Sequence, residues 1–186
     1  MQTNTVTNEY LKTICGNNNI AKCVEDMALW KFNQRSINTN NFAAFCLYYA
    51  FKACNVPRTL TEVSKMCFVT QSDIIKYERE ENQRPIKPSD LTSRACYRLG
   101  LDNFQLQMQV SAVADEIYKT LLRNSPPQSV LAITLYVLSS ILKWSKRIKR
   151  DTAWACHVSI SCVRRLYRIY KADILEIVAS ILQEDS

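Results

Sequence analysis

Residues 41–48 read NFAAFCLY, and residues 128–136 read QSVLAITLY. Both stretches are apolar and rich in small residues, and each contains a Leu-Tyr pair, at positions 47–48 and 135–136. Around the first stretch, Phe42, Phe45, Cys46 and Tyr49 follow the i, i+3, i+4, i+7 spacing of a helix face. The two Leu-Tyr pairs lie 88 residues apart, which is too long for a solenoid repeat. This spacing predicts two tandem all-α domains of five helices each.

The composition agrees with a helical protein. Gly16 and Gly100 are the only glycines, and there are five prolines in 186 residues, too few for the tight turns of an all-β fold. Glycine-rich phosphate-binding loops are excluded for the same reason. A hydrophobic content of 47% excludes wholesale disorder. No long apolar run is present, and the first ten residues lack the apolar segment of a secretory signal, so no membrane partner is expected.

The charge is strongly basic and unevenly distributed. The net charge is +7, with +2 from residues 1–86 (10 basic, 8 acidic) and +5 from residues 87–186 (14 basic, 9 acidic). A basic protein favours an acidic partner, which is either nucleic acid or an anionic surface.

Eight cysteines are scattered over apolar helical segments. Because no secretory signal precedes them, we expect buried, reduced thiols in an intracellular protein rather than disulfides. No C-x-x-C motif occurs, so the sequence predicts neither a zinc ribbon nor another metal site.

Capping residues divide the chain into helices. Thr59 with Glu62, and Thr70 with Asp73, form capping boxes, and the polar run at 38–41 caps the helix after it. In the first domain, residues 1–83, the expected helices are 9–15, 20–32, 42–53 and two that begin at the capping boxes. A proline-containing linker is expected at 80–88. In the second domain, residues 84–186, the expected helices are 88–98, 103–122, 127–142, 151–156 and 160–182.

Residues 143–171 indicate a helix-turn-helix. A short helix at 151–156 is followed by a turn at 157–159, with Ser159 as the N-cap of the next helix. That helix carries Arg164 and Arg168 on one face, with Arg165 beside them. Five positive charges precede the motif between 143 and 150. Arginine pairs with guanine or phosphate, and lysine-rich segments bind phosphates, so the motif suits DNA. The alternative is a solvated helix face beside a basic loop.

The candidate DNA-binding residues of this motif are Lys146, Arg147, Lys149, Arg150, Arg164, Arg165 and Arg168.

Nearly the whole chain resembles the core of the transcription factor IIB (TFIIB) family, which consists of two cyclin-like repeats. The similar stretches are AAFCLY at 43–48, VPRT at 56–59, PSDLTSRACYRLGL at 88–101, PQSV at 127–130 with Tyr136, and VRRLYR at 163–168. No single motif decides the resemblance. It rests on the order and spacing of these motifs over residues 43–168.

The resemblance implies an all-α fold of two five-helix cyclin-like repeats, the second containing the helix-turn-helix. It implies binding to promoter DNA and TATA-binding protein, and a bridge to RNA polymerase. Arg164 occupies the family's base-reading position. Ser161 stands where the family often has valine, which adds it to the DNA-binding candidates with an altered specificity. Basic positions that would face TATA-binding protein or DNA are Arg35, Lys52, Lys76 and Arg79.

Another departure from the family matters more, since the chain contains neither the zinc ribbon nor the reader segment of TFIIB. No cofactor is therefore expected in this chain, and a zinc ribbon in a full-length protein would lie outside it. The resemblance also implies a monomeric nuclear protein, or one at a cytoplasmic viral replication site. A TFIIB-related factor that serves another polymerase, or a viral or protist homologue, is a further alternative. The asparagine-rich N-terminal stretch and the low glycine content indicate a divergent or AT-rich genome.

Catalysis is not expected, because a histidine-dependent site would have to use His157 alone. A cyclin-type regulator of a kinase is the alternative function. It requires a lysine and a glutamate on the third and fifth helices, for which Lys52 with Glu78 or Glu80 would serve. The three tryptophans are expected to pack in the core or an interface rather than to stack on bases; they are Trp30, Trp144 and Trp154.

Overall fold

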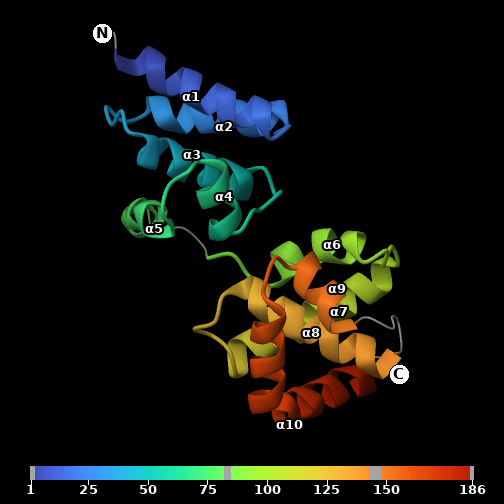
Figure 1. Ribbon diagram of the computed structural model, residues 1–186. Helices are drawn as coiled ribbons and strands as arrows, with labels where there is room; N and C mark the ends of the chain where they lie inside the picture. Colours follow the sequence, from blue (N-terminus) through green and yellow to red (C-terminus); the bar gives the residue numbers. More distant parts are fainter. Residues whose placement is uncertain (1–2, 82–84, 143–147, 185–186) are drawn as a thin grey trace. The chain divides into compact units, whose positions relative to one another are not determined.

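The structure is a computed structural model that describes residues 3–81, 85–142 and 148–184. Within these ranges it contains ten α-helices and no strand (Figure 1), which confirms the all-α class expected from the sequence.

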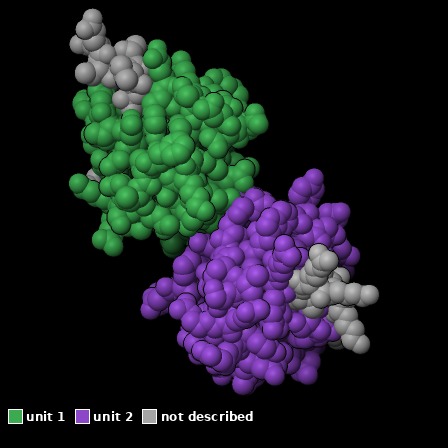
Figure 2. Space-filling model, in the orientation of Figure 1, with its two compact units in different colours: residues 1–86 green, residues 87–186 purple. Residues whose placement is uncertain are grey.

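The chain divides into two compact units, residues 1–86 and residues 87–186 (Figure 2). Unit 1 contains helices α1 to α5, and unit 2 contains α6 to α10. The boundary expected from the sequence, between 83 and 84, falls in residues 82–84, outside the described residues. The assignment of each unit as a cyclin-like repeat stays a prediction.

In unit 1 the helices are α1 (Thr3–Asn17), α2 (Lys22–Asn33), α3 (Asn40–Ala53), α4 (Leu60–Met66) and α5 (Gln71–Glu80). In unit 2 they are α6 (Ser89–Arg98), α7 (Phe104–Thr120), α8 (Pro127–Leu142), α9 (Ile148–Ala155) and α10 (Ile160–Glu184). The largest difference from expectation is α1, which begins six residues before Glu9. No proline or glycine interrupts residues 3–15, so the helix continues through the polar stretch.

Helix α3 is the centre of unit 1. It packs against each of the other four helices, and nearly all its residues from Phe42 to Phe51 are buried. Helices that are apolar all round are buried in this way. Its aromatic side chains continue into α5, where the Tyr77 ring lies edge-on to Phe42 with centroids 5.2 Å apart. Each large side chain buried here contributes about 1.5–3 kcal/mol.

Helix α8 has the same role in unit 2. It packs against α6, α7, α9 and α10, and it is buried without interruption from Ser129 to Ser139. The one threonine in the middle, Thr134, satisfies its hydroxyl by donating a hydrogen bond to the Val130 carbonyl at 2.9 Å. The two stretches that define the repeat in the sequence are thus the central helices of the two units.

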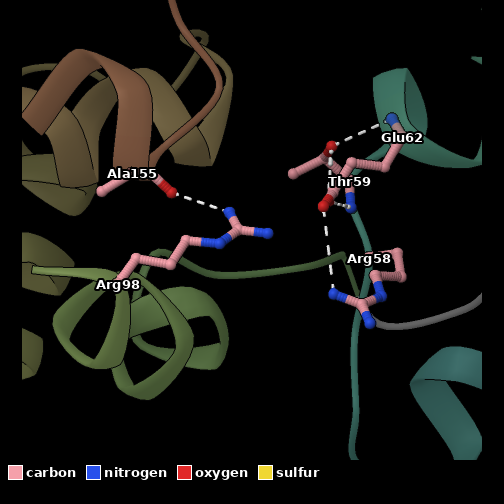
Figure 3. A network of polar contacts seen from close by, with 5 residues as sticks. All are labelled: Arg58, Thr59, Glu62, Arg98 and Ala155. Carbon is pink, nitrogen blue, oxygen red and sulfur yellow. Dashed lines mark hydrogen bonds and ion pairs between the residues drawn. The ribbon is translucent and has the colours of Figure 1, made fainter.

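The caps expected in unit 1 are confirmed. The Thr39 hydroxyl accepts a hydrogen bond from the Phe42 amide at 3.2 Å. Thr59 and Glu62 form a reciprocal capping box at the start of α4 (Figure 3). Thr70 and Asp73 form the second box at the start of α5. These caps satisfy amide groups at the helix N-termini that have no partner within the helix.

Two of the tryptophans are not in the core. Trp30 is 54% exposed and Trp154 is 63% exposed, so the expectation of core packing is wrong for both, and interface packing stays a prediction. On α2 the buried positions are Val24, Ala28, Lys31 and Phe32, a helical stripe that excludes Trp30. Trp144 lies outside the described residues.

None of the helices within the described ranges is both long and apolar enough to cross a bilayer.

Candidate nucleic-acid interface

The short helix α9 and its following turn form the first half of the site. Ala153, Ala155 and Cys156 are buried, which fixes α9 on the core of unit 2. The chain then turns at His157, whose φ is +54°. The Val158 amide donates to the Ala153 carbonyl at 2.9 Å, a bond typical of helix ends with a left-handed residue.

Ser159 starts the second helix, α10. Its hydroxyl accepts a hydrogen bond from the Cys162 amide at 3.1 Å, which confirms it as the N-cap. The conformation of the tight turn between α9 and α10 is thus fixed at both ends, by the left-handed backbone of His157 and by the N-cap Ser159.

The inner face of α10 attaches it to the core. Val163 and Leu166 are buried, and the Tyr167 ring lies edge-on to Tyr136 of α8, with centroids 4.9 Å apart and planes at 87°. Such edge-to-face pairs contribute about 0.5–1.5 kcal/mol beyond their buried area. The orientation of α10 about its own axis is therefore set by α8.

That orientation leaves the basic residues outside. Arg164, Arg165 and Arg168 are exposed, and Arg164 and Arg168 share a face because they lie one turn apart. Ser161 is also exposed, and its hydroxyl donates to the Ser159 hydroxyl at 3.0 Å. The structure thus brings four of the candidate DNA-binding residues onto one exposed segment of α10.

Two further candidates lie at the start of α9. Lys149 and Arg150 are exposed, and the Lys149 ammonium lies 5.2 Å from the centroid of the Tyr136 ring. Tyr136 therefore contacts both halves of the motif, α9 through Lys149 and α10 through Tyr167. The candidates Lys146 and Arg147 lie outside the described residues.

Arg98 is a positioning residue that the sequence did not single out. From the end of α6, its guanidinium donates to the carbonyl of Ala155, the last residue of α9, at 2.9 Å (Figure 3). The negative end of α9 thus receives a positive charge, which is the favourable arrangement for a helix C-terminus. A basic residue in the last turn of a helix is too common for the sequence to have revealed this contact.

Helix α10 is interrupted at Tyr170, where φ is −112° and ψ is 15°. The exposed arginines lie before this kink. Beyond it, the buried Ile174 and Val178 attach the rest of the helix to unit 2. The sequence predicts one uninterrupted helix here and does not indicate the kink, because no proline or glycine marks it.

Unit 1 contains a turn with the same design. Phe68, with φ of +52°, corresponds to His157, and Thr70 corresponds to the N-cap Ser159. The Val69 amide donates to the Ser64 carbonyl at 3.1 Å, as Val158 does to Ala153. Lys76 and Arg79 on α5 after this turn are exposed. Their role toward TATA-binding protein or DNA stays a prediction.

The other two basic candidates of unit 1 are engaged within the protein. Lys52 forms an ion pair with Glu78 at 3.0 Å, and Arg35 forms one with Glu81 at 2.8 Å. Lys31, which is 8% exposed, binds the same Glu81 at 2.9 Å. These contacts fasten α5 to α2 and α3. The partner-binding roles of Arg35 and Lys52 stay predictions.

The described part of the chain shows no cluster of three or more His, Cys, Asp or Glu side chains that could hold a metal ion.

The fold and the exposed face of α10 define a class: an all-α protein with a helix-turn-helix whose second helix presents arginines to solvent. The comparisons with known proteins narrow this class. No family model matches the chain. The chain is 29% identical over 143 residues to transcription initiation factor IIB of Pyrococcus furiosus, which covers 72% of this chain and 47% of that protein.

Two further relatives carry the same name. That of Encephalitozoon cuniculi is 22% identical over 181 residues, covering 89% of this chain and 58% of that protein. That of Methanothrix thermoacetophila is 28% identical over 140 residues, covering 72% and 41%. The chain spans about half the length of the relatives it matches. The chain is thus similar to archaeal and microsporidian proteins of this name, and this similarity supports a TFIIB-like core.

Proposed function

We propose that this chain is the core of a TFIIB-like initiation factor that binds promoter DNA through α10. One observation carries the proposal: Arg164, Arg165 and Arg168 stand exposed on a helix whose inner face packs on the core and whose start is fixed by an N-cap and a tight turn. A rigid helix with exposed arginines after a tight turn has the geometry of a major-groove recognition helix.

Lys149 and Arg150 extend the positive surface onto α9. Contacts from these residues to phosphates would position the motif without reading sequence, while Arg164 would read a base edge. The proposed partners are promoter DNA, TATA-binding protein and RNA polymerase. The last two rest on the resemblance to TFIIB. The proposed role is binding without catalysis, in the nucleus or at a cytoplasmic viral replication site.

A salt titration of DNA binding tests the proposal. If the five exposed cations of α9 and α10 neutralise five phosphates, the slope of log K against log salt will be about −4.5. Fluorescence anisotropy with labelled promoter duplex measures it, with and without TATA-binding protein, and binding is expected to be tighter with that protein present. Absence of DNA binding under both conditions at low salt would refute the proposal.

The cyclin-type alternative is less well supported by the geometry. It needs Lys52 and a glutamate of α5 to face a kinase. The Lys52 and Glu78 side chains instead bind each other and are only 13% and 20% exposed. The alternative also leaves the arginines of α10 without a role. Copurification of a protein kinase with the chain, lost in Lys52→Ala, would favour it.

A further inference from the structure

The eight cysteines, all of them free, differ in their access to solvent. Five are buried: Cys15, Cys46, Cys67, Cys96 and Cys156. Cys54 and Cys162 are partly exposed, and Cys23 is exposed. The expectation of buried thiols therefore holds for five cysteines and fails for these three.

Two of the accessible cysteines lie together. Cys23 is in the first turn of α2, and Cys54 directly follows the last residue of α3. The two helices pack closely, so the start of α2 meets the end of α3. The Cys54 thiol donates a hydrogen bond to the Cys23 carbonyl, with sulfur and oxygen 3.7 Å apart. Burial, and after it the electrostatic interaction with the Cys23 thiol, raise the pKa of Cys54.

We propose that Cys23 and Cys54 form an oxidisable dithiol, in which a peroxide converts the two thiols into a disulfide between the start of α2 and the end of α3. The site takes hydrogen peroxide or an organic hydroperoxide as oxidant. The disulfide is a reversible modification that a small dithiol reductant removes.

The chemistry proceeds in two balanced steps. The Cys23 sulfur, as thiolate, attacks one peroxide oxygen and breaks the O–O bond, giving a sulfenic acid; the hydroxide released takes up the thiol proton as water. The Cys54 sulfur, on losing its proton, then attacks the Cys23 sulfur and expels hydroxide, which leaves as a second water. Two thiols and one hydrogen peroxide give one disulfide and two waters; with an organic hydroperoxide the first leaving group takes up the proton as an alcohol, and the products are one disulfide, one alcohol and one water. Cys23 reacts first because it is the more exposed sulfur.

The buried cysteines do not compete. Cys15 interacts with Cys67, and Cys96 with Cys156, so two more pairs of thiols lie near each other inside the units. Burial raises the pKa of Cys67 and of Cys156 to about 12. Since the thiolate is the reactive form, these thiols stay protonated and shielded near neutral pH.

The disulfide would close a loop that contains nearly all of α2 and all of α3, two helices that carry Lys31 and much of the core of unit 1. Closing a loop of this length restricts the unfolded chain and stabilises the folded unit. The exposed arginines of α10 are in the other unit. Oxidation is therefore expected to raise the melting temperature of unit 1 and to leave the arginine surface of α10 chemically unchanged.

Mass spectrometry of the whole chain tests the proposal. After treatment with stoichiometric hydrogen peroxide and blocking of free thiols, the monomer is expected to have lost two hydrogens. A tryptic digest is expected to contain residues 23–31 joined to residues 53–58, and reduction is expected to separate them. Melting followed by circular dichroism is expected to show a rise of several degrees in oxidised protein.

The single variants Cys23→Ser and Cys54→Ser provide the comparison, with Cys162→Ser as the matched control for a partly exposed cysteine outside the pair. Both pair variants are expected to lose the crosslinked peptide and the rise in melting temperature, while Cys162→Ser keeps them. Phenylarsine oxide gives a second readout, since it binds two neighbouring thiols: one equivalent is expected to protect the wild type from thiol blocking at both positions. Crosslinks between chains, crosslinks through other cysteines, or sulfenic acid without a disulfide would each overturn the proposal.

Discussion

Arg164 and Lys52 carry the same charge in very different surroundings. The Arg164 side chain is exposed on a helix held from behind by Val163 and Leu166. The Lys52 ammonium binds Glu78 and lies 5.1 Å from the centroid of the Tyr48 ring. A basic residue that the sequence predicts to bind a partner is available to that partner only where the fold leaves its side chain in solvent.

Arg164→Ala is expected to weaken DNA binding by about 1–3 kcal/mol and to relax the sequence preference, because a bidentate contact to a base edge would be lost. Lys149→Ala is expected to weaken binding on all sequences alike and to reduce the salt slope by about one. Anisotropy titrations with matched and scrambled promoter duplexes measure both effects.

Lys119→Ala is the control, since Lys119 is an exposed lysine of unit 2 that pairs only loosely, at 3.5 Å, with Glu116. It is expected to leave affinity nearly unchanged. Equal losses on all sequences for Arg164→Ala would identify this residue as a phosphate contact and contradict its base-reading role.

At the scale of elements, α5 is attached to its unit by two carboxylates, Glu78 on the helix and Glu81 directly after it. Glu81 accepts from Lys31 and Arg35, and Glu78 accepts from Lys52. Lys76 and Arg79 point to solvent from the same helix. Acidic side chains therefore hold α5 on its unit, and basic side chains of the same helix face solvent. A substitution of an acidic residue is expected to change the stability of the protein, and a substitution of an exposed basic residue is not.

Glu81→Gln is expected to destabilise the protein by on the order of 3 kcal/mol, because the buried ammonium of Lys31 would lose its charged partner. Urea denaturation followed by circular dichroism measures the loss. Adding Lys31→Met is expected to recover part of it, since the unpaired charge is then removed. A double variant less stable than both single variants would show that this pair is not the source of the loss.

The contact between α6 and α9 is the corresponding attachment in the helix-turn-helix. Arg98→Met removes the hydrogen bond to the Ala155 carbonyl and is expected to cost about 1.5–3 kcal/mol in stability. It is also expected to lower DNA affinity, because the turn before α10 loses its support. Arg98→Lys is expected to retain part of the stability and part of the DNA affinity. Urea denaturation measures the stability, and fluorescence anisotropy measures the affinity. Loss of stability without loss of affinity would limit Arg98 to a structural role.

At the scale of the whole molecule, the buried thiols make the free energy of unfolding depend on pH in the alkaline range. Burial raises the pKa of Cys67 and of Cys156 from an ordinary value of 9.0 to about 12. Between these values the unfolded chain releases protons that the folded chain keeps. Their contribution to stability is therefore complete below pH 9.0 and is lost as the pH rises toward about 12.

The free energy of unfolding is thus expected to fall between about pH 9 and about pH 11, as measured by urea denaturation under reducing conditions. The double variant with Cys67→Ala and Cys156→Ala is the comparison. Its stability is expected to be lower near neutral pH and to fall less steeply with pH. An equal slope in both proteins would exclude these thiols as the cause.

The caps and the turn of the helix-turn-helix could be predicted because they are local. Thr59, Thr70 and Ser159 bind amides three residues away, so their geometry depends only on neighbouring sequence. The early start of α1 and the kink at Tyr170 could not be predicted, because no local residue marks them. The exposure of Trp30 likewise depended on which face of α2 meets α3.

The sequence by itself determined the helical class, the two apolar helices at the centres of the units, and the arginines on one face of α10. Periodicity and capping carry these features, and both act over one or two helical turns. Only the tertiary structure decided that Lys52 and Arg35 face glutamates, that Arg98 holds the end of α9, and that Cys23 meets Cys54. Each of these contacts joins residues far apart in the chain, and their pairing depends on how whole helices pack.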